Sequence, residues 1–207
     1  LMVINVDILV DQIVQRFGVS IIHEFGDFYK YNSQRLQVLD RKTLRQAIKL
    51  YCENPEECYE TYGFSAYWNV SNITNMDYIF CESKFNGDIS QWDVSNVETM
   101  ENMFETTRFN GDISQWDVSN VKTMYNMFCY TYFNSDISKW DVSSVRDMYC
   151  MFYKSKFNGD LSQWNVSNVQ NMHSMFYESK FNGDLSQWDV SNVTMLHSMF
   201  YKSKFNG

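Results

Sequence analysis

The sequence lacks several features that whole classes of protein require. It carries 17 Lys and Arg residues against 25 Asp and Glu residues, and its formal net charge is −8. Binding to nucleic-acid phosphates needs clustered positive charge, so this balance argues against a nucleic-acid partner. No apolar run approaches the ~20 residues that a membrane-spanning helix requires. We therefore expect neither a nucleic-acid partner nor a membrane span.

Signs of secretion and of a disulfide framework are also missing. The leading residues, Leu-Met-Val-Ile-Asn-Val-Asp, lack the basic segment and the small-residue cleavage site of a secretory signal. The cysteines are odd in number and recur at no fixed place in the chain: Cys52, Cys58, Cys81, Cys129 and Cys150. We expect buried thiols in a reducing compartment, which favours an intracellular or virion location, with the cell surface as the alternative.

What the sequence does contain is a repeat with a period of 24 residues. Its most regular marker is tryptophan, at Trp68, Trp92, Trp116, Trp140, Trp164 and Trp188. Self-similarity at a fixed period is the signature of stacked repeats. The pattern predicts a solenoid of six repeats over residues 68–207, preceded by a helical cap region over residues 1–67. The chain ends at the opening of a seventh copy, so we expect further chain or another molecule to cover the last coil, with end-to-end packing as a candidate contact.

The strict apolar columns predict which side chains face the shared core. In the second copy they are Ile89, Trp92, Val94, Val97, Met100, Met103, Phe104 and Phe109. The spacing of Val97, Met100, Met103 and Phe104 predicts a short helix, with Ser95 in its N-cap position. The segment that holds Trp92 and Val94 predicts a short strand, and stacked copies would form a narrow parallel sheet. The recurring Asn at 86, 110, 134, 158, 182 and 206 predicts an amide ladder that bonds the neighbouring coil's backbone.

Four helices are expected before the repeats. Apolar spacing predicts the first over residues 6–17, and Ser20 is a candidate cap for a second that reaches Tyr31. Thr43 with Gln46 predicts the cap of a third, and Asn54 followed by Pro55 predicts the start of a fourth that stops at Gly63. Such a helical unit would cover the first coil, whose apolar columns need a neighbour.

The repeated run Phe-Asn-Gly-Asp-Ile-Ser-Gln-Trp-Asp-Val-Ser-Asn-Val-x-x-Met-x-x-Met-Phe resembles the repeat of BspA-like surface proteins. These are also described as mycoplasma-type lipoprotein repeats, a divergent relative of leucine-rich repeats. The resemblance covers residues 43–207. It implies an α/β, leucine-rich-repeat-like solenoid with one short parallel strand and one short helix per repeat, and a non-catalytic surface or adhesion protein. Relatives in large DNA viruses give the alternative, a structural component of a virus particle whose open end packs on another chain.

Two acidic columns are the sharpest chemical features. One follows the turn, at Asp88, Asp112, Asp136, Asp160 and Asp184, and the other follows the Trp, at Asp93, Asp117, Asp141 and Asp189. Like charges stacked at the spacing of strands repel by ~1 kcal/mol per pair in water, and Ca²⁺ between coils would relieve that repulsion. Each carboxylate could instead accept a backbone N–H in an Asx-turn. We favour the turns and expect no metal or other cofactor, because one carboxylate per coil supplies few of the ligands that Ca²⁺ takes.

The exposed positions beside each Trp form the predicted partner-binding face, which would contact a protein. Its members are Gln91, Asp93, Gln115, Asp117, Lys139, Asp141, Gln163, Asn165, Gln187 and Asp189. His173 and His197 share a column, but no Cys or carboxylate recurs there to complete a zinc site. No nucleophile stands in a fixed relation to a base, so we expect no enzyme activity.

Overall fold

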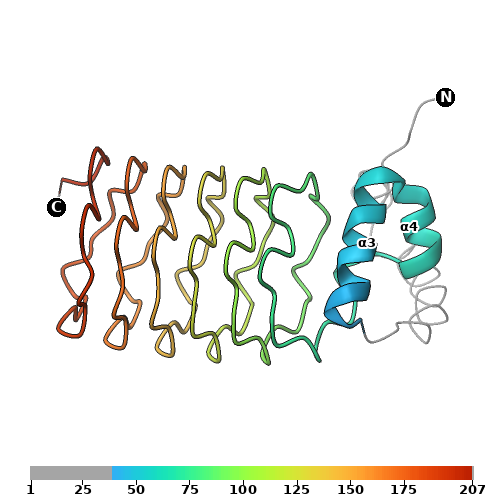
Figure 1. Cartoon of the computed structure of the whole chain (residues 1–207), viewed down its shortest axis with the longest axis horizontal. Coiled ribbons are helices and arrows are strands. Elements are labelled where there is room, and N and C mark those ends of the chain that lie inside the picture. The colour runs from blue at the N-terminus through green and yellow to red at the C-terminus, as the bar shows by residue number, and fades with distance from the viewer. Residues whose placement is uncertain (1–38, 207) are drawn as a thin grey trace, which may run out of the picture.

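Two helices form the N-terminal part of the described chain, which covers residues 39–206 of a computed structural model (Figure 1). Helix α3 spans Arg41–Glu53 and α4 spans Pro55–Tyr62, and a 3-10 turn, η1, follows at Ser65–Tyr67. Helix α4 starts as predicted, because the Asn54 side chain accepts from the backbone N–H of Glu57 and Pro55 takes the first helical position. Gly63 ends it with φ 70°. The helices predicted over residues 6–17 and 20–31 lie outside the described residues.

The predicted cap of α3 was wrong by three residues. Asp40, and not Thr43, is the N-cap, and its carboxylate accepts from the backbone N–H of Thr43 at 2.7 Å. Arg41 and Lys42 therefore belong to the first turn. The helix buries Leu44, Ala47 and Ile48, the apolar face that the spacing predicted.

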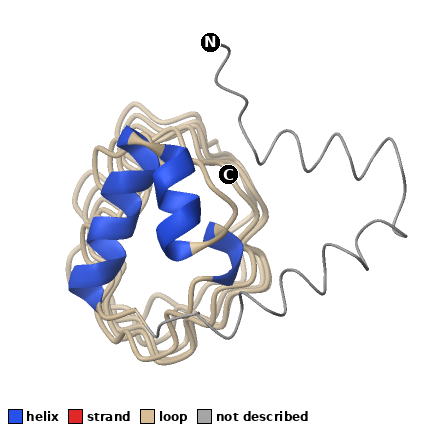
Figure 2. Cartoon of the chain, turned by 90° about the vertical axis from the view of Figure 1, so that its right-hand side faces the viewer, coloured by secondary structure: helices blue, strands red, loops and turns tan. Residues whose placement is uncertain are grey.

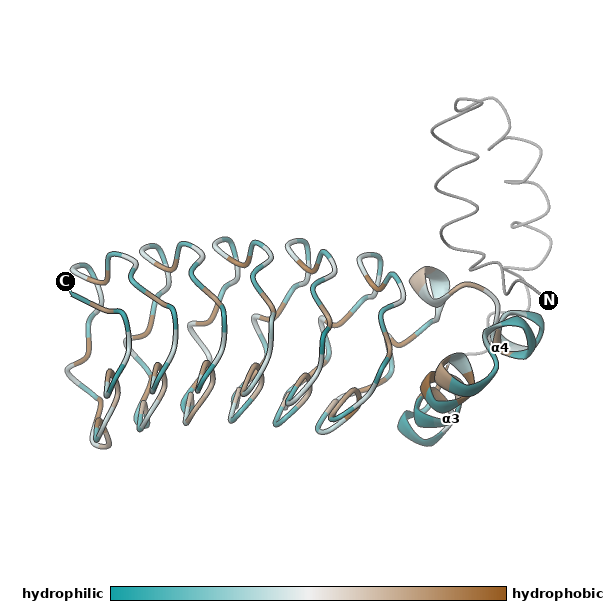
Figure 3. Cartoon of the chain, turned by 90° about the horizontal axis from the view of Figure 1, so that it is seen from above, coloured by the Kyte–Doolittle hydropathy of each residue, from teal (hydrophilic) through white to brown (hydrophobic). Residues whose placement is uncertain are grey.

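The rest of the chain is a stack of coils, one for each tryptophan, which we number from coil 1 with Trp68 to coil 6 with Trp188 (Figure 1). Viewed along the stack, the coils overlie one another, and the two helices lie in front of them at the N-terminal end (Figure 2). The Tyr51 and Phe85 rings, 4.6 Å apart between centroids, join this helical pair to coil 1. The view from above shows the same order, with the helices beyond the first coil (Figure 3).

The core columns are buried as predicted. Val97, Met100, Met103 and Phe104 are each 0% exposed, and the equivalent residues of the inner coils match them. Each inner Trp is also tied to the preceding coil, as where the Trp116 indole N–H donates to the Ile89 carbonyl at 3.0 Å. Burial fails only in coil 6, where Val190 is 43% exposed and Leu196 48% exposed, because neighbouring coils on both sides are what bury these columns.

The short helix predicted in each repeat was wrong for the described coils, and so was the cap role of Ser95. Alternate N–H groups of this segment donate to the next coil: Met100 to the Thr123 carbonyl, and Phe104 to the Met127 carbonyl, at 3.2 and 3.0 Å. The N–H groups between them close tight turns, as from Met103 to the Met100 carbonyl. Bonds between coils have thus replaced the i to i−4 bonds of a helix.

The parallel sheet is present only as one bridge per interface, and it lies elsewhere than predicted. The bridges join Asn75 to Thr99, Thr99 to Thr123, and so on to Met195. The predicted strand around Trp92 is instead two turns, which the Trp92 and Val97 N–H groups close on the Ile89 and Val94 carbonyls. Whether this stack is a relative of the leucine-rich-repeat solenoid stays a prediction.

Candidate interaction surfaces

The predicted partner-binding face is exposed at all ten of its positions. Local hydrogen bonds fix where its side chains stand. The Asp93 carboxylate accepts from the Ser95 N–H at 3.1 Å and from the Ser95 hydroxyl at 2.6 Å. Asn165 makes the same two contacts with Ser167, which explains why an amide can replace the carboxylate in this column. The face is thus a regular polar surface with one Gln or Lys and one Asp or Asn per coil.

The other acidic column forms Asx-turns. Asp88, Asp112, Asp136, Asp160 and Asp184 each accept from the N–H of the Ser two residues later, at 2.8 to 2.9 Å. The bonds from Ser114 hold the pKa of Asp112 below its usual value, and those from Ser138 do the same for the pKa of Asp136. Within residues 39–206, no three His, Cys, Asp or Glu side chains come together in a way that could hold a metal ion.

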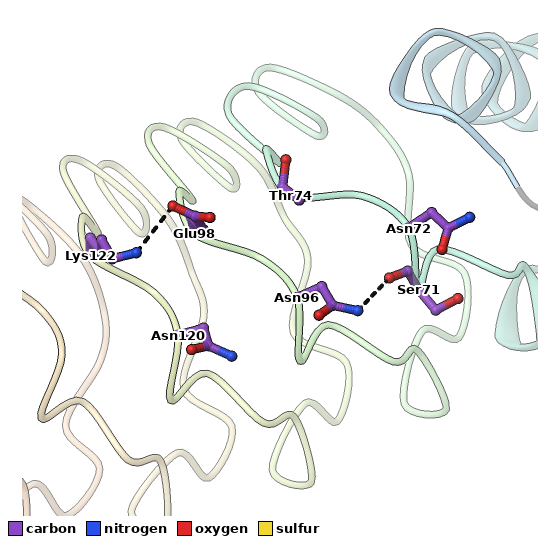
Figure 4. Close-up of a pocket in the computed structure, with 7 residues that line it drawn as sticks. All are labelled: Ser71, Asn72, Thr74, Asn96, Glu98, Asn120 and Lys122. Atoms are coloured by element: carbon purple, nitrogen blue, oxygen red, sulfur yellow. Dashed lines mark hydrogen bonds and ion pairs between the residues drawn. The ribbon is translucent and has the colours of Figure 1, made fainter.

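A polar groove lies over coils 1 to 3, and sequence reasoning missed it (Figure 4). It has a volume of about 460 Å³ and is lined by Ser71, Asn72, Thr74, Asn96, Glu98, Asn120 and Lys122. The Asn96 amide donates to the Ser71 carbonyl at 2.9 Å, and Lys122 pairs with Glu98 at 3.1 Å. The recurring Asn at 72, 96 and 120 was the available signal. The groove offers amide and hydroxyl groups for hydrogen bonding but contains neither Cys nor His as a nucleophile or base.

Residues that break the period collect on the bridge-bearing side of the later coils. Tyr125, Tyr149 and His173 stack at centroid distances of 4.7 and 5.2 Å, and Tyr153, Tyr177 and Tyr201 form a second stack at 4.7 and 5.0 Å. In the first two coils the same columns hold Asp77, Glu101, Cys81 and Glu105. His173 and His197 are neighbours here, with ring centroids 5.9 Å apart, as part of an aromatic stack.

Lysine side chains border the second stack. The Lys154 ammonium lies 5.4 Å from the Tyr130 ring centroid and 3.5 Å from a Glu178 carboxylate oxygen. Lys156 lies 5.8 Å from the Tyr132 centroid. Tyr132 is 62% exposed, so a large aromatic surface remains open to a partner.

The five cysteines are all free thiols, but they differ in how deeply they are buried. Cys58, Cys129 and Cys150 are buried as predicted, whereas Cys52 is exposed and Cys81 is half-buried. Burial raises the pKa of Cys129 to about 12 and the pKa of Cys150 to about 11. The buried thiols are therefore poor nucleophiles.

The repeat region matches a family model described as "Mycoplasma protein of unknown function, DUF285", over residues 60–154 and 129–207. The chain belongs to this family. The match covers the tandem coils and agrees with the resemblance to mycoplasma-type repeats, while it gives the virus-particle alternative no support. Neither the curated proteins nor the solved structures contain a match to this DUF285 member. No helix among its described residues is long and apolar enough to cross a membrane.

Proposed function

We propose that this DUF285 member is a non-catalytic interaction module that binds a protein partner, as a surface or adhesion protein does. The observation that carries the proposal is that, within each coil, some side chains hold the fold and others remain exposed for a partner. The apolar columns and the Trp indole hold one coil on the next, and the Asx carboxylates hold the turns within a coil. The side chains that remain for a partner recur once per coil along an extended surface, which is the way that solenoids bind.

The predicted partner-binding face supplies the first place to test this proposal. Its Asp93, Asp117 and Asp141 side chains are exposed on three successive coils. A partner that spans these coils would bury them together and would need complementary basic or amide groups. Replacing all three with Lys would reverse the charge of this surface while leaving the buried columns untouched.

The test uses the whole chain, immobilised, to capture surface proteins from candidate host cells. We expect a captured protein to be lost with the variant D93K/D117K/D141K. The matched control is E53K/E56K/E60K, which reverses three exposed charges on α3 and α4, away from the coils. Equal capture by the wild type and the partner-face variant would reject this face as the binding surface, and measurable turnover of a captured substrate would reject the non-catalytic assignment.

A further inference from the structure

One exposed column of the coils is cationic along most of the stack. It holds Lys84, Arg108, Lys156, Lys180 and Lys204, which we call the cationic row. Tyr132 takes the remaining position, and Lys156 lies over its ring. None of the five cations forms an ion pair with another residue in the described range 39–206. Such a row is unexpected in a chain whose formal net charge is −8.

Backbone bonds hold the row in register. The N–H groups of Lys156, Lys180 and Lys204 donate to carbonyls of the preceding coil, those of Thr131, Ser155 and Ser179, at 3.1 to 3.3 Å. The neighbouring tyrosines, Tyr153, Tyr177 and Tyr201, repeat at 4.7 and 5.0 Å. Cations at this spacing repel one another, although the flexible lysine stems and salt reduce the cost. The backbone holds the charges in line, so a linear anion can meet all of them at once.

A second row of hydrogen-bond donors runs beside the first. Asn110, Asn134, Asn158 and Asn182 are exposed, and each lies two residues beyond a cationic-row position, with a buried Phe between. Residues two apart in an extended segment point to the same side. The side-chain oxygen of each Asn accepts the backbone N–H of the next coil's Asn at 2.6 to 3.0 Å. The amide NH₂ groups therefore remain as donors, so the two rows together offer ammonium and amide N–H groups.

Several acidic residues near the rows have partners of their own. Glu178 pairs with Lys154 at 3.5 Å and with Lys202 at 4.0 Å. Asp136, Asp160 and Asp184 follow the Asn row by two residues, and the Ser N–H groups hold them in their own turns. These aspartates border the donor rows on one side and restrict a bound anion to the line of Lys and Asn.

We propose that the cationic row and the adjacent asparagines bind a linear acidic polysaccharide along the axis of the coils. A glycan that carries carboxylates or sulfates offers anions to the row, and it also offers hydroxyl and ring oxygens as acceptors to the Asn amides. An extended acidic peptide repeats its same-side charges at about 6.6–6.8 Å, so it drifts out of register with coils about 4.8 Å apart. Exposed Tyr132 adds an apolar ring surface for a sugar.

This inference rests on the proposed interaction function but uses a different surface from the partner-binding face. The experiment measures the affinity of the whole chain for a heparin oligosaccharide by isothermal titration calorimetry. Length-matched poly-L-glutamate and single-stranded DNA serve as competing polyanions. The row variant is K156E/K180E/K204E, and K156Q/K180Q/K204Q removes the charges without reversing them. The matched control, K42E/R45E/R146E, changes the net charge of the chain by the same amount at exposed sites outside the row and the partner-binding face.

We expect the wild type to bind heparin, with an affinity that falls as salt rises. The row variant should lose affinity by at least roughly tenfold, the neutral variant by less, and the control by little. The melting temperature of each variant identifies any that fails to fold. If the row variant does not fold, the heparin affinity of the neutral variant tests the proposal instead.

Absence of heparin binding by the wild type would overturn the proposal, as would equal losses in the row variant and the control. Tighter binding of poly-L-glutamate or DNA through the same row would assign it to another class of polymer. Protein capture lost in D93K/D117K/D141K but kept in K156E/K180E/K204E would leave the proposed function standing whatever the heparin result.

Discussion

At the scale of the residue, the coils place ordinary side chains in a conformation that L-residues avoid. Asn102 and Thr106 have φ values of 52° and 55°, and equivalent positions in every other coil also have positive φ. The turns closed from Met100 to Met103 and from Phe104 to Thr107 require this at their third residue, where Gly or Asn is favoured. Thr106 is the costliest kind of occupant, because its β-carbon is branched.

Replacing Thr106 with Asn should therefore stabilise the protein by about 1 kcal/mol, since Asn tolerates the left-handed region and Thr106 is exposed. Urea unfolding followed by tryptophan fluorescence would measure the change. The neighbouring substitution T107N is the control and should destabilise, because Thr107 is buried and its hydroxyl donates to the Phe104 carbonyl at 3.0 Å. A lower midpoint for T106N would show that the turn does not strain this residue.

The thiols give a second prediction at this scale. In the native protein at neutral pH, a thiol reagent should modify Cys52 first, because that side chain is exposed. Cys81 should react slowly, since burial raises its pKa to about 11, and Cys58, Cys129 and Cys150 should react only on unfolding. Mass spectrometry of the labelled peptides over time would give the order, and the substitution C52S should remove the fast phase.

At the scale of the element, the Asx-turns shape each coil and make it sensitive to acid. Bonds from the Ser114 and Ser138 N–H groups lower the pKa of Asp112 and Asp136, and the Ser143 hydroxyl and N–H lower the pKa of Asp141. A carboxyl whose folded pKa is depressed contributes stability above its unfolded pKa and loses it as the pH falls through the folded pKa.

The melting temperature should accordingly fall as the pH drops below about 4, near the usual pKa of an Asp carboxyl. The variant D112N/D136N/D141N should show a smaller fall, because Asn keeps the acceptor oxygen but does not titrate, as Asn165 already does in coil 5. Differential scanning calorimetry between pH 3 and pH 6 would compare the two. Identical pH profiles would mean that other groups cause the acid sensitivity.

At the scale of the whole molecule, each coil within residues 39–206 bonds to the coils beside it, and coil 1 also contacts α3. The Trp indoles, the Asn side chains and alternate backbone N–H groups, such as that of Met100, each reach one coil along the stack. Stability should then be close to a sum of coil and interface contributions, as it is in proteins built from stacked repeats.

Removing one whole period, residues 109–132, joins Arg108 to Phe133 and keeps every column in register. We expect this shortened chain to fold, with a melting temperature less than about 10 °C below that of the full chain. Removing only residues 109–120 should prevent proper folding, because it places polar residues in the buried columns. Circular dichroism and thermal melts would measure both, and equal disruption by the two deletions would argue against independent coils.

The sequence by itself determined the period, the identity of the buried columns and the start of α4 at Pro55. These depend on which side chains avoid water and on local capping, and residue types and their spacings determine both. The sequence also predicted the Asx-turns, because Asp-x-Ser recurs in every coil.

Only the tertiary structure decided the backbone path between these residues. Val97, Met100 and Phe104 have helical spacing, yet no helix forms, because carbonyls of the next coil take the N–H groups that a helix would use. The same partners moved the parallel pairing from the Trp92 segment to Thr99. Stacking also brought Lys156, Lys180 and Lys204 into line, although 24 residues separate each from the next. The physical reason is common to all three: a backbone group or charge acquires its neighbours from the adjacent coil, whose position only the fold supplies.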